Sequence, residues 1–116
     1  MSSRRHSGAA ALKTRASVFA ALGDETRLRL LARLSSQGPE SIVALSARAD
    51  VTRQAITKHL ETLAEAGVVH GTRSGRERIW EIETRRIEKA RRCLEDISDQ
   101  WDAAMARLRA FVEDKP

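Results

Sequence analysis

Apolar residues recur along most of the chain at the spacing of amphipathic helices. Residues three or four apart share one face of a helix, so each such stripe predicts a helix with one buried side. The first stripe, which closes at Gly23, consists of Leu12, Ala16, Phe19 and Leu22. A second helix follows Asp24, a residue type that caps helix N-termini, and stops at Gly38 and Pro39. Its apolar residues are Leu28, Leu30, Leu31 and Leu34.

Two further helices are predicted around a short turn. Ser41 can cap a third helix carrying Ile42, Leu45 and Ala49. Asp50 is expected in the turn, where a left-handed residue is often needed and Asp is tolerated. Thr52 can cap the fourth helix, because its hydroxyl can accept a bond from a first-turn N–H. The apolar stripe of this helix, at spacings of four, three and four, consists of Ile56, Leu60, Leu63 and Gly67.

After Gly67 the helical spacing gives way to alternation. Arg78, Trp80 and Ile82 alternate with their neighbours, as in a strand with one buried face. The pair Ser74–Gly75 is a hairpin signal. The sequence therefore predicts a two-stranded β-ribbon with arginines around its tip.

A long helix over about residues 85–114 completes the chain. Its apolar residues alternate spacings of three and four, which is a heptad seam of the kind used for association between helices. The seam consists of Ile87, Ala90, Leu94, Ile97, Trp101, Ala104, Leu108 and Phe111. We therefore expect a mainly α fold of about five helices with a small β-hairpin, and a helical dimer interface.

The charge of the chain indicates the kind of partner that it binds. The 116-residue chain has a net charge of +5, which favours a polyanion such as nucleic acid. Residues 1–92 hold 18 Lys and Arg against 10 Asp and Glu, a net of +8, whereas residues 93–116 hold 3 against 6, a net of −3. The basic part is thus expected to face phosphate while the acidic tail points elsewhere. Only 3% of the residues are aromatic, so a base-stacking platform for single strands is hard to assemble and duplex DNA suits the composition better.

Other function classes find little support in the sequence. The single cysteine, Cys93, excludes an internal disulfide and a zinc site built on several thiolates, and it fits a reducing cytoplasm. No apolar run is long enough to span a membrane. We find no nucleophile–base pair and no phosphate-binding loop, so no enzyme activity and no cofactor are predicted.

Two helices joined by a short turn form a helix-turn-helix, and the arginine-tipped hairpin makes it a winged one. In this arrangement the second helix reads base edges while the wing holds phosphates. The candidate recognition-helix contacts are Thr52, Arg53, Gln54, Thr57, Lys58 and His59. The candidate wing contacts are Arg73, Arg76 and Arg78. The alternative interpretation is an ordinary amphipathic helix with a solvated basic face.

Two segments carry a resemblance to a known family. Residues 19–31 (Phe-Ala-Ala-Leu-Gly-Asp-Glu-Thr-Arg-Leu-Arg-Leu-Leu) resemble the signature that opens the ArsR family of bacterial repressors. Residues 55–60 and 63–69 resemble that family's recognition helix, and the match covers about residues 18–83. The resemblance implies a homodimeric repressor that binds imperfect inverted repeats in promoters and pairs through its first and last helices. The candidate interface residues are Leu12, Phe19, Leu94, Ile97, Trp101, Met105, Leu108 and Phe111.

The sequence departs from the family at its metal sites. Residues 41–48 contain no thiol or imidazole, and the last helix has three aspartates but no His. Borderline metals prefer nitrogen and sulfur ligands, so we predict no metal site. Cys93 is expected to be inert near the dimer seam, since a redox switch would lack a resolving partner. Trp101 and Phe111 could line a ligand pocket, but aromatics on a heptad seam more often pack.

Two interpretations remain open for His59 and for the chain as a whole. The resemblance to the family implies that His59 lies near the DNA backbone, and the alternative is that it holds a neighbouring side chain at the edge of the core. Residues 1–9 are predicted to be a disordered basic arm, and residues 10–116 a single winged helix-turn-helix domain. The predicted function is a sequence-specific regulator of transcription that binds double-stranded DNA. The alternative is a protein-interaction module that uses the C-terminal helix.

Overall fold

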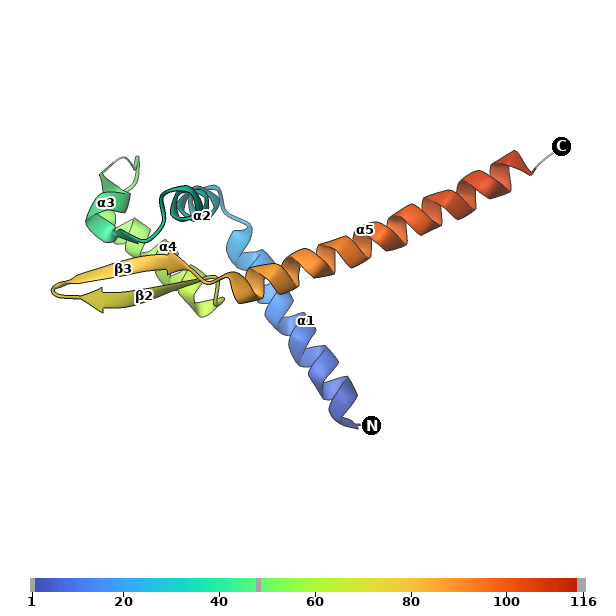
Figure 1. Cartoon of the computed structure of the whole chain (residues 1–116), viewed down its shortest axis with the longest axis horizontal. Helices are drawn as coiled ribbons and strands as arrows, with labels where there is room; N and C mark the ends of the chain where they lie inside the picture. The colour runs from blue at the N-terminus through green and yellow to red at the C-terminus, as the bar shows by residue number, and fades with distance from the viewer. Residues whose placement is uncertain (1, 48, 115–116) are drawn as a thin grey trace.

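Five helices and three short strands make up the described part of the chain (Figure 1). The computed structural model describes residues 2–47 and 49–114, so Met1 of the predicted arm and Lys115 and Pro116 of the predicted domain lie outside it. The elements are α1 (Ser2–Leu22), α2 (Glu25–Gln37), β1 (Glu40–Ser41), α3 (Ile42–Ser46), α4 (Arg53–Glu65), β2 (Val69–Ser74), β3 (Glu77–Ile82) and α5 (Thr84–Glu113). Helix α1 thus runs through the segment expected to be an arm, and the division into arm and domain stays a prediction.

The predicted caps set most helix boundaries. Asp24 accepts a bond from the N–H of Arg27, Ser41 from that of Ala44, and Thr52 from that of Ala55, each three residues on. Gly38 ends α2 with φ at 81°. One expectation was wrong: Asp50 is not left-handed, because no described residue other than glycine has a positive φ.

The sheet has one strand more than predicted. Its order is β1-β3-β2, with both pairings antiparallel. The hairpin between β2 and β3 places Ser74 opposite Glu77, so its loop is two residues long, and Gly75 has a φ of 64° at the first of them. The added strand β1 pairs Glu40 with Trp80 and Ser41 with Ile79. It therefore ties the segment before α3 to the base of the wing.

One hydrophobic core lies where α1, α2, α3, α4 and the base of the hairpin meet. Its fully buried large side chains are Trp80, Leu45, Ile56, Leu60, Leu63, Val18 and Val68. Helix α2 buries Leu30, Leu31 and Leu34, whereas Leu28 of the predicted stripe is exposed. In α1 the fully buried residue is Val18, while Phe19 and Leu22 pack partly against the core.

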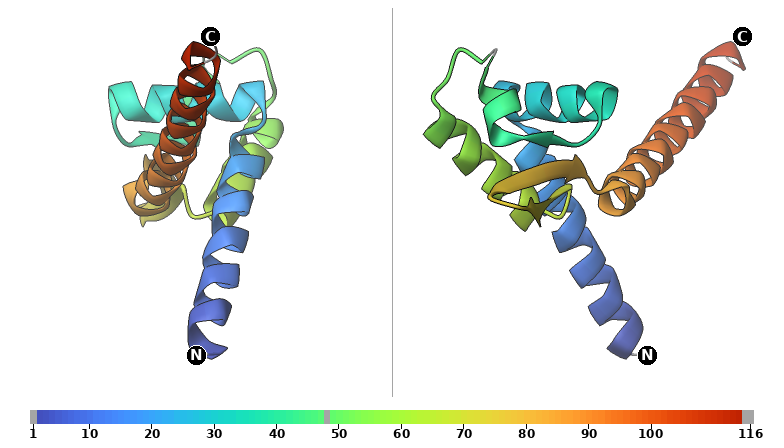
Figure 2. Two further views of the ribbon diagram at one scale, coloured as in Figure 1. Left: turned by 90° about the vertical axis from the view of Figure 1, so that its right-hand side faces the viewer. Right: turned by 60° about the vertical axis from the view of Figure 1, so that its left-hand side comes forward.

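Helix α5 leaves this core and projects far beyond it (Figures 1 and 2). Its first turns contribute Ala90 and Ile87 to the core, and the rest extends alone. The radius of gyration is therefore 19.5 Å, against roughly 13 Å for a compact chain of this length. Of the described helices, none combines the length and apolar character that crossing a membrane requires.

Candidate nucleic-acid interface

Helix α4 presents one buried and one exposed face, as its sequence predicts. Ile56, Leu60 and Leu63 are wholly buried against the core. Arg53, Gln54 and Lys58 on the other face are exposed. The buried stripe fixes the helix to the body of the protein, so the exposed side chains are presented on a rigid element.

The exposed face of α4 carries unoccupied hydrogen-bond donors. Within the described residues, the side chains of Arg53, Gln54 and Lys58 form no hydrogen bond or ion pair. Thr57 is half-buried and its hydroxyl donates to the carbonyl of Arg53 at 2.9 Å. Four of the predicted contact residues line a shallow hollow of about 560 Å³ on this face, namely Thr52, Gln54, Thr57 and Lys58. Arginine and glutamine at such positions can address guanine and adenine edges in a major groove.

His59 points toward α2 instead of along the exposed face. Arg27 donates to its Nδ1 at 3.3 Å, and the Asp24 carboxylate lies 4.0 Å from the same nitrogen. The guanidinium of Arg27 also donates to the carbonyls of Ala21 at 2.6 Å and Ala20 at 3.4 Å, at the end of α1. Arg27 thus joins α1, α2 and α4. This geometry supports the second interpretation of His59, in which it holds a neighbouring side chain.

Asp24 is the electrostatic partner in this cluster. The backbone N–H of Arg27 donates to its carboxylate and holds the pKa of Asp24 below its usual range. The Arg27 guanidinium and His59 act in the same direction. The N-terminus of α2 and the middle of α4 are therefore linked through one charged cluster.

The wing places two arginines directly opposite each other. Arg73 on β2 pairs with Arg78 on β3, and Arg76 lies in the two-residue loop at the tip. All three side chains are exposed. Like charges facing each other across a strand pair are destabilising, and a bound anion relieves that repulsion. The tip is therefore electrostatically suited to phosphate.

Arg78 also packs against its own strand. Its guanidinium carbon lies 4.4 Å from the centre of the Trp80 ring, a cation–π contact. A Cβ at Gly71 would lie 2.6 Å from the Nε of Arg78, so a larger residue there would displace this side chain. The Arg78 side chain is thus held against Trp80, whereas no such ring contact within the described residues holds Arg73 or Arg76.

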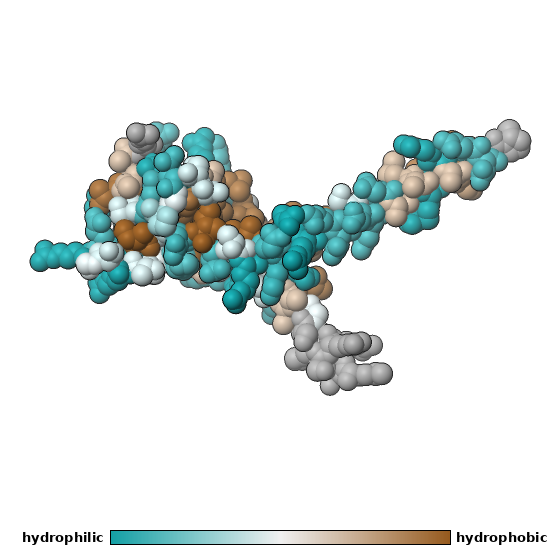
Figure 3. Space-filling model, viewed as in Figure 1, coloured by the Kyte–Doolittle hydropathy of each residue, from teal (hydrophilic) through white to brown (hydrophobic). Residues whose placement is uncertain are grey.

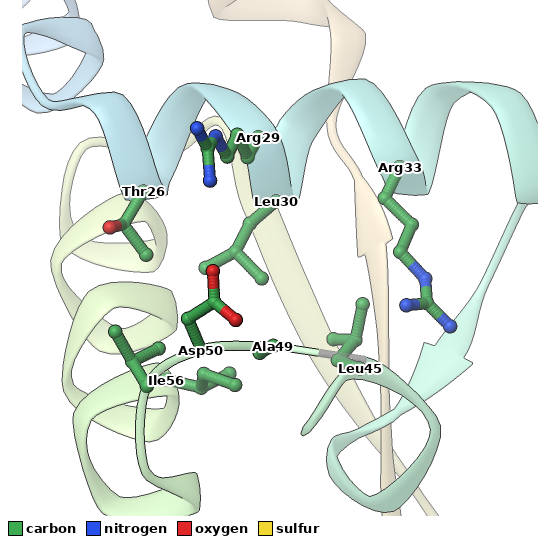
Figure 4. A pocket seen from close by; sticks show the side chains of 9 residues that line it. Thr26, Arg29, Leu30, Arg33, Leu45, Ala49, Asp50 and Ile56 are labelled. Atoms are coloured by element: carbon green, nitrogen blue, oxygen red, sulfur yellow. The ribbon is translucent and has the colours of Figure 1, made fainter. Parts of the chain in front are cut away.

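A small cavity of about 150 Å³ lies behind the turn that precedes α4 (Figure 4). Leu30, Leu45 and Ile56 form its apolar lining, and Asp50 extends toward α2. Arg33 reaches from α2 to the other end of the cavity, where it donates to the Glu40 carboxylate at 2.8 Å and to the carbonyl of Ala44 at 2.9 Å. These contacts of Arg33 hold α2 against β1 and α3.

The predicted dimer residues are mostly on the surface of the single chain. Phe19 is half-buried against the core, and the other seven are 45–65% exposed. Those seven are Leu12, Leu94, Ile97, Trp101, Met105, Leu108 and Phe111. Six of them lie on α5, where apolar patches alternate with polar surface (Figure 3). So many exposed large apolar side chains on one helix are unusual on a monomer and typical of an interface.

Sequence reasoning gave no role to Arg27, Arg33 and Arg86. Arg86 donates to the carbonyl of Ala66, the C-cap residue of α4, at 3.1 Å. Arg27 stands three residues after a capping Asp, but no sequence signal indicated its link to His59. Cys93 is a half-buried free thiol. Among the described residues, no group of three His, Cys, Asp or Glu side chains is arranged to hold a metal ion.

A helix-turn-helix whose second helix presents free donors beside a basic wing defines a DNA-binding protein of the winged helix-turn-helix class. Comparison with known proteins agrees: residues 22–72 match a helix-turn-helix domain family. An uncharacterized HTH-type transcriptional regulator of Bacillus subtilis, YuzN, is 40% identical over 68 residues, which cover 53% of this chain and 74% of the relative. The chain belongs to the ArsR family of DNA-binding transcriptional regulators.

Solved structures share the fold over most of the chain. An ArsR-like transcriptional regulator from Rhodococcus sp. RHA1 is 38% identical with a TM-score of 0.77, covering 90% of this chain and 97% of that one. A homodimeric winged helix-turn-helix DNA-binding domain from Mycobacterium bovis is 24% identical with a TM-score of 0.64, covering 79% and 84%. The second likeness concerns the fold alone.

Proposed function

We propose that the protein is a homodimeric repressor that inserts α4 into the major groove of an inverted-repeat promoter site. The observation that carries the proposal is the exposed face of α4, where three unpartnered donor side chains are presented by a helix whose other face is buried. Arg53, Gln54 and Lys58 would read base edges, supported by Thr52 and Thr57. Arg73, Arg76 and Arg78 would contact phosphate.

A second copy of the chain is the proposed partner of α1 and α5. The exposed residues Leu94, Ile97 and Trp101 continue the seam that Ala90 begins in the core. The homodimeric domain from Mycobacterium bovis shares this fold. A symmetric dimer presents two copies of α4, which is the reason to expect two related half-sites. We assign the protein to the cytoplasm and give it no catalytic role, no cofactor and no metal.

The recognition-helix assignment is tested with R53A/K58A. Both side chains are exposed and unpartnered, so their removal should leave the fold and the dimer intact while abolishing specific binding to the promoter. Gel-shift titration against the promoter and an unrelated duplex measures the effect. The matched control is R107A/R109A, which removes the same charge from the far part of α5. Retention of specific binding by R53A/K58A would show that α4 does not read the site.

The dimer assignment is tested with L94D/W101D. Two carboxylates on the apolar face should prevent pairing, and loss of two-site binding should then weaken promoter affinity strongly. Sedimentation velocity gives the oligomeric state. A wild-type chain that sediments as a monomer would instead favour the alternative, a protein-interaction module that uses α5. Unchanged dimerisation of L94D/W101D would place the interface elsewhere.

A further inference from the structure

A basic groove lies where α1 and α5 cross, on the side of the body away from the wing tip (Figures 1 and 2). It has a volume of about 300 Å³. Arg15 of α1 and Arg86, Lys89 and Arg92 of α5 line it, together with Thr14. Its floor is apolar, formed by Ala11 and Val18. None of the lining residues is acidic.

Three of these cations have no direct partner in the described part of the chain, although the charge of Arg92 acts on the Glu88 carboxylate. Within the described residues, Arg15, Lys89 and Arg92 take part in no hydrogen bond or ion pair. Elsewhere on α5 the structure does provide partners: Arg91 is paired with both Glu88 and Glu95. The groove therefore gathers like charges that repel one another unless an anion joins them.

Arg86 differs from the other three because it is anchored. Its Nη1 donates to the carbonyl of Ala66 at 3.1 Å, and its side chain lies over Gly67, where an added Cβ would come within 2.6 Å of its Cδ. One guanidinium of the groove is thus already positioned. A pre-positioned cation reduces the entropy lost when a ligand binds.

The groove is distinct from the proposed dimer faces. At about 100° per residue, the lining residues of α1 are centred roughly 100° around the helix from Leu12 and Phe19. Those of α5 are centred roughly 110° from Leu94, Ile97 and Trp101. The groove is therefore centred beside the apolar faces and not on them. The crossing of α1 and α5 also lies at the opposite end of the body from the wing tip (Figure 1).

We propose that this groove binds a small phosphate-bearing anion. Guanidinium and ammonium groups with no partner are the groups that proteins use for phosphate, and three of them match an anion that carries several negative charges. The volume is that of a small-molecule site and is too small for a duplex. Because Arg86 also holds the C-terminus of α4, occupancy should alter promoter binding; this second step rests on the proposed function, whereas binding itself does not.

The test uses the full chain and inorganic pyrophosphate as the probe, at constant ionic strength and without divalent metal. Isothermal titration calorimetry measures binding to the wild type, to R15Q/K89Q and to the control K13Q/R107Q, which removes one cation from each of the same helices outside the groove. Wild type and control should bind with similar affinity. R15Q/K89Q should bind about tenfold or more weakly, because two charge-assisted contacts are lost. R92Q, a milder variant, should show a smaller loss in the same direction.

Three results would overturn the proposal. One is the absence of saturable binding to the wild type at millimolar pyrophosphate. Another is equal affinity of R15Q/K89Q and the wild type. The third is competition by DNA: a duplex of unrelated sequence displaces pyrophosphate and binds R15Q/K89Q more weakly than it binds K13Q/R107Q. That result would make the groove part of the DNA-binding surface of the protein. None of these readouts requires a promoter, so failure here is separable from failure of the proposed function.

Discussion

Gly67 follows the C-cap of α4 in a conformation that only glycine adopts freely, with φ at 78°. An added Cβ would lie 2.6–2.8 Å from Cδ, Nη1 and Nε of Arg86. Gly67→Ala therefore imposes two separate penalties. The backbone must hold an L residue in the left-handed region, and Arg86 must move away from the carbonyl of Ala66, to which it donates.

Each penalty has an expected size. The left-handed conformation costs about 1–2 kcal/mol for an alanine. A hydrogen bond from a charged donor contributes about 1.5–3 kcal/mol when protected, and about 1 kcal/mol is appropriate here because Arg86 is exposed. We expect Gly67→Ala to lower the free energy of unfolding by about 2–3 kcal/mol. Gly38→Ala is the matched control, since Gly38 has a φ of 81° and no heavy atom within 4 Å of an added Cβ. Gly38→Ala should lower the free energy of unfolding only by the penalty for the left-handed backbone conformation.

A double-mutant cycle compares the wild type, Gly67→Ala, Arg86→Ala and the double variant. Urea denaturation at one fixed protein concentration measures the free energy of unfolding of each. In an R86A background, Gly67→Ala should cost about 1 kcal/mol less than in the wild type, because the displaced contact is already absent. An equal cost in both backgrounds would refute the role given to Arg86. So would a Gly38→Ala penalty as large as that of Gly67→Ala.

Three further predictions concern the core, the charged cluster and the DNA contact. Leu60→Ala removes a wholly buried side chain and should cost about 2–5 kcal/mol in the same urea assay; a loss below about 1 kcal/mol would contradict the packing described for α4. The pKa of Asp24 is lowered from its ordinary value of about 3.9, so its charge stabilises the fold above that value and ceases to do so as the pH falls through the lower folded-state pKa. Asp24→Asn should therefore be less stable than the wild type at neutral pH and equally stable in strong acid. A difference in stability that persisted in strong acid would contradict a stabilising role for the charge of Asp24. Promoter affinity should fall with salt at a log–log slope of about −5, for roughly six neutralised phosphates, and a slope near zero would exclude extensive phosphate contact.

The helices and their ends were largely predictable because their signals are local. Capping by Asp24, Ser41 and Thr52 and the stop at Gly38 depend on residues within one turn of each boundary. The alternation over residues 78–83 likewise predicted a strand, which the structure places at Glu77–Ile82. These features depend on residues that are close in sequence, so a local sequence pattern can predict them.

What could not be predicted depends on contacts between distant segments. The strand β1 is two residues long and exists only because Glu40 and Ser41 meet β3. The link from Arg27 to His59 joins residues 32 positions apart, and no pattern in either helix indicates it. The heptad seam of α5 was found, but not its division at Ala90 between the protomer core and an exposed face.

The central claim is that two copies of α4 read an inverted repeat. Fragments bound by the full chain are selected from the source genome, and hydroxyl-radical footprinting is carried out on them with the wild type and R53A/K58A. We expect two symmetric protected half-sites whose centres are about one helical turn of DNA, or a multiple of it, apart, and we expect R53A/K58A to protect neither. A single protected patch, or protection that survives in R53A/K58A, would contradict it.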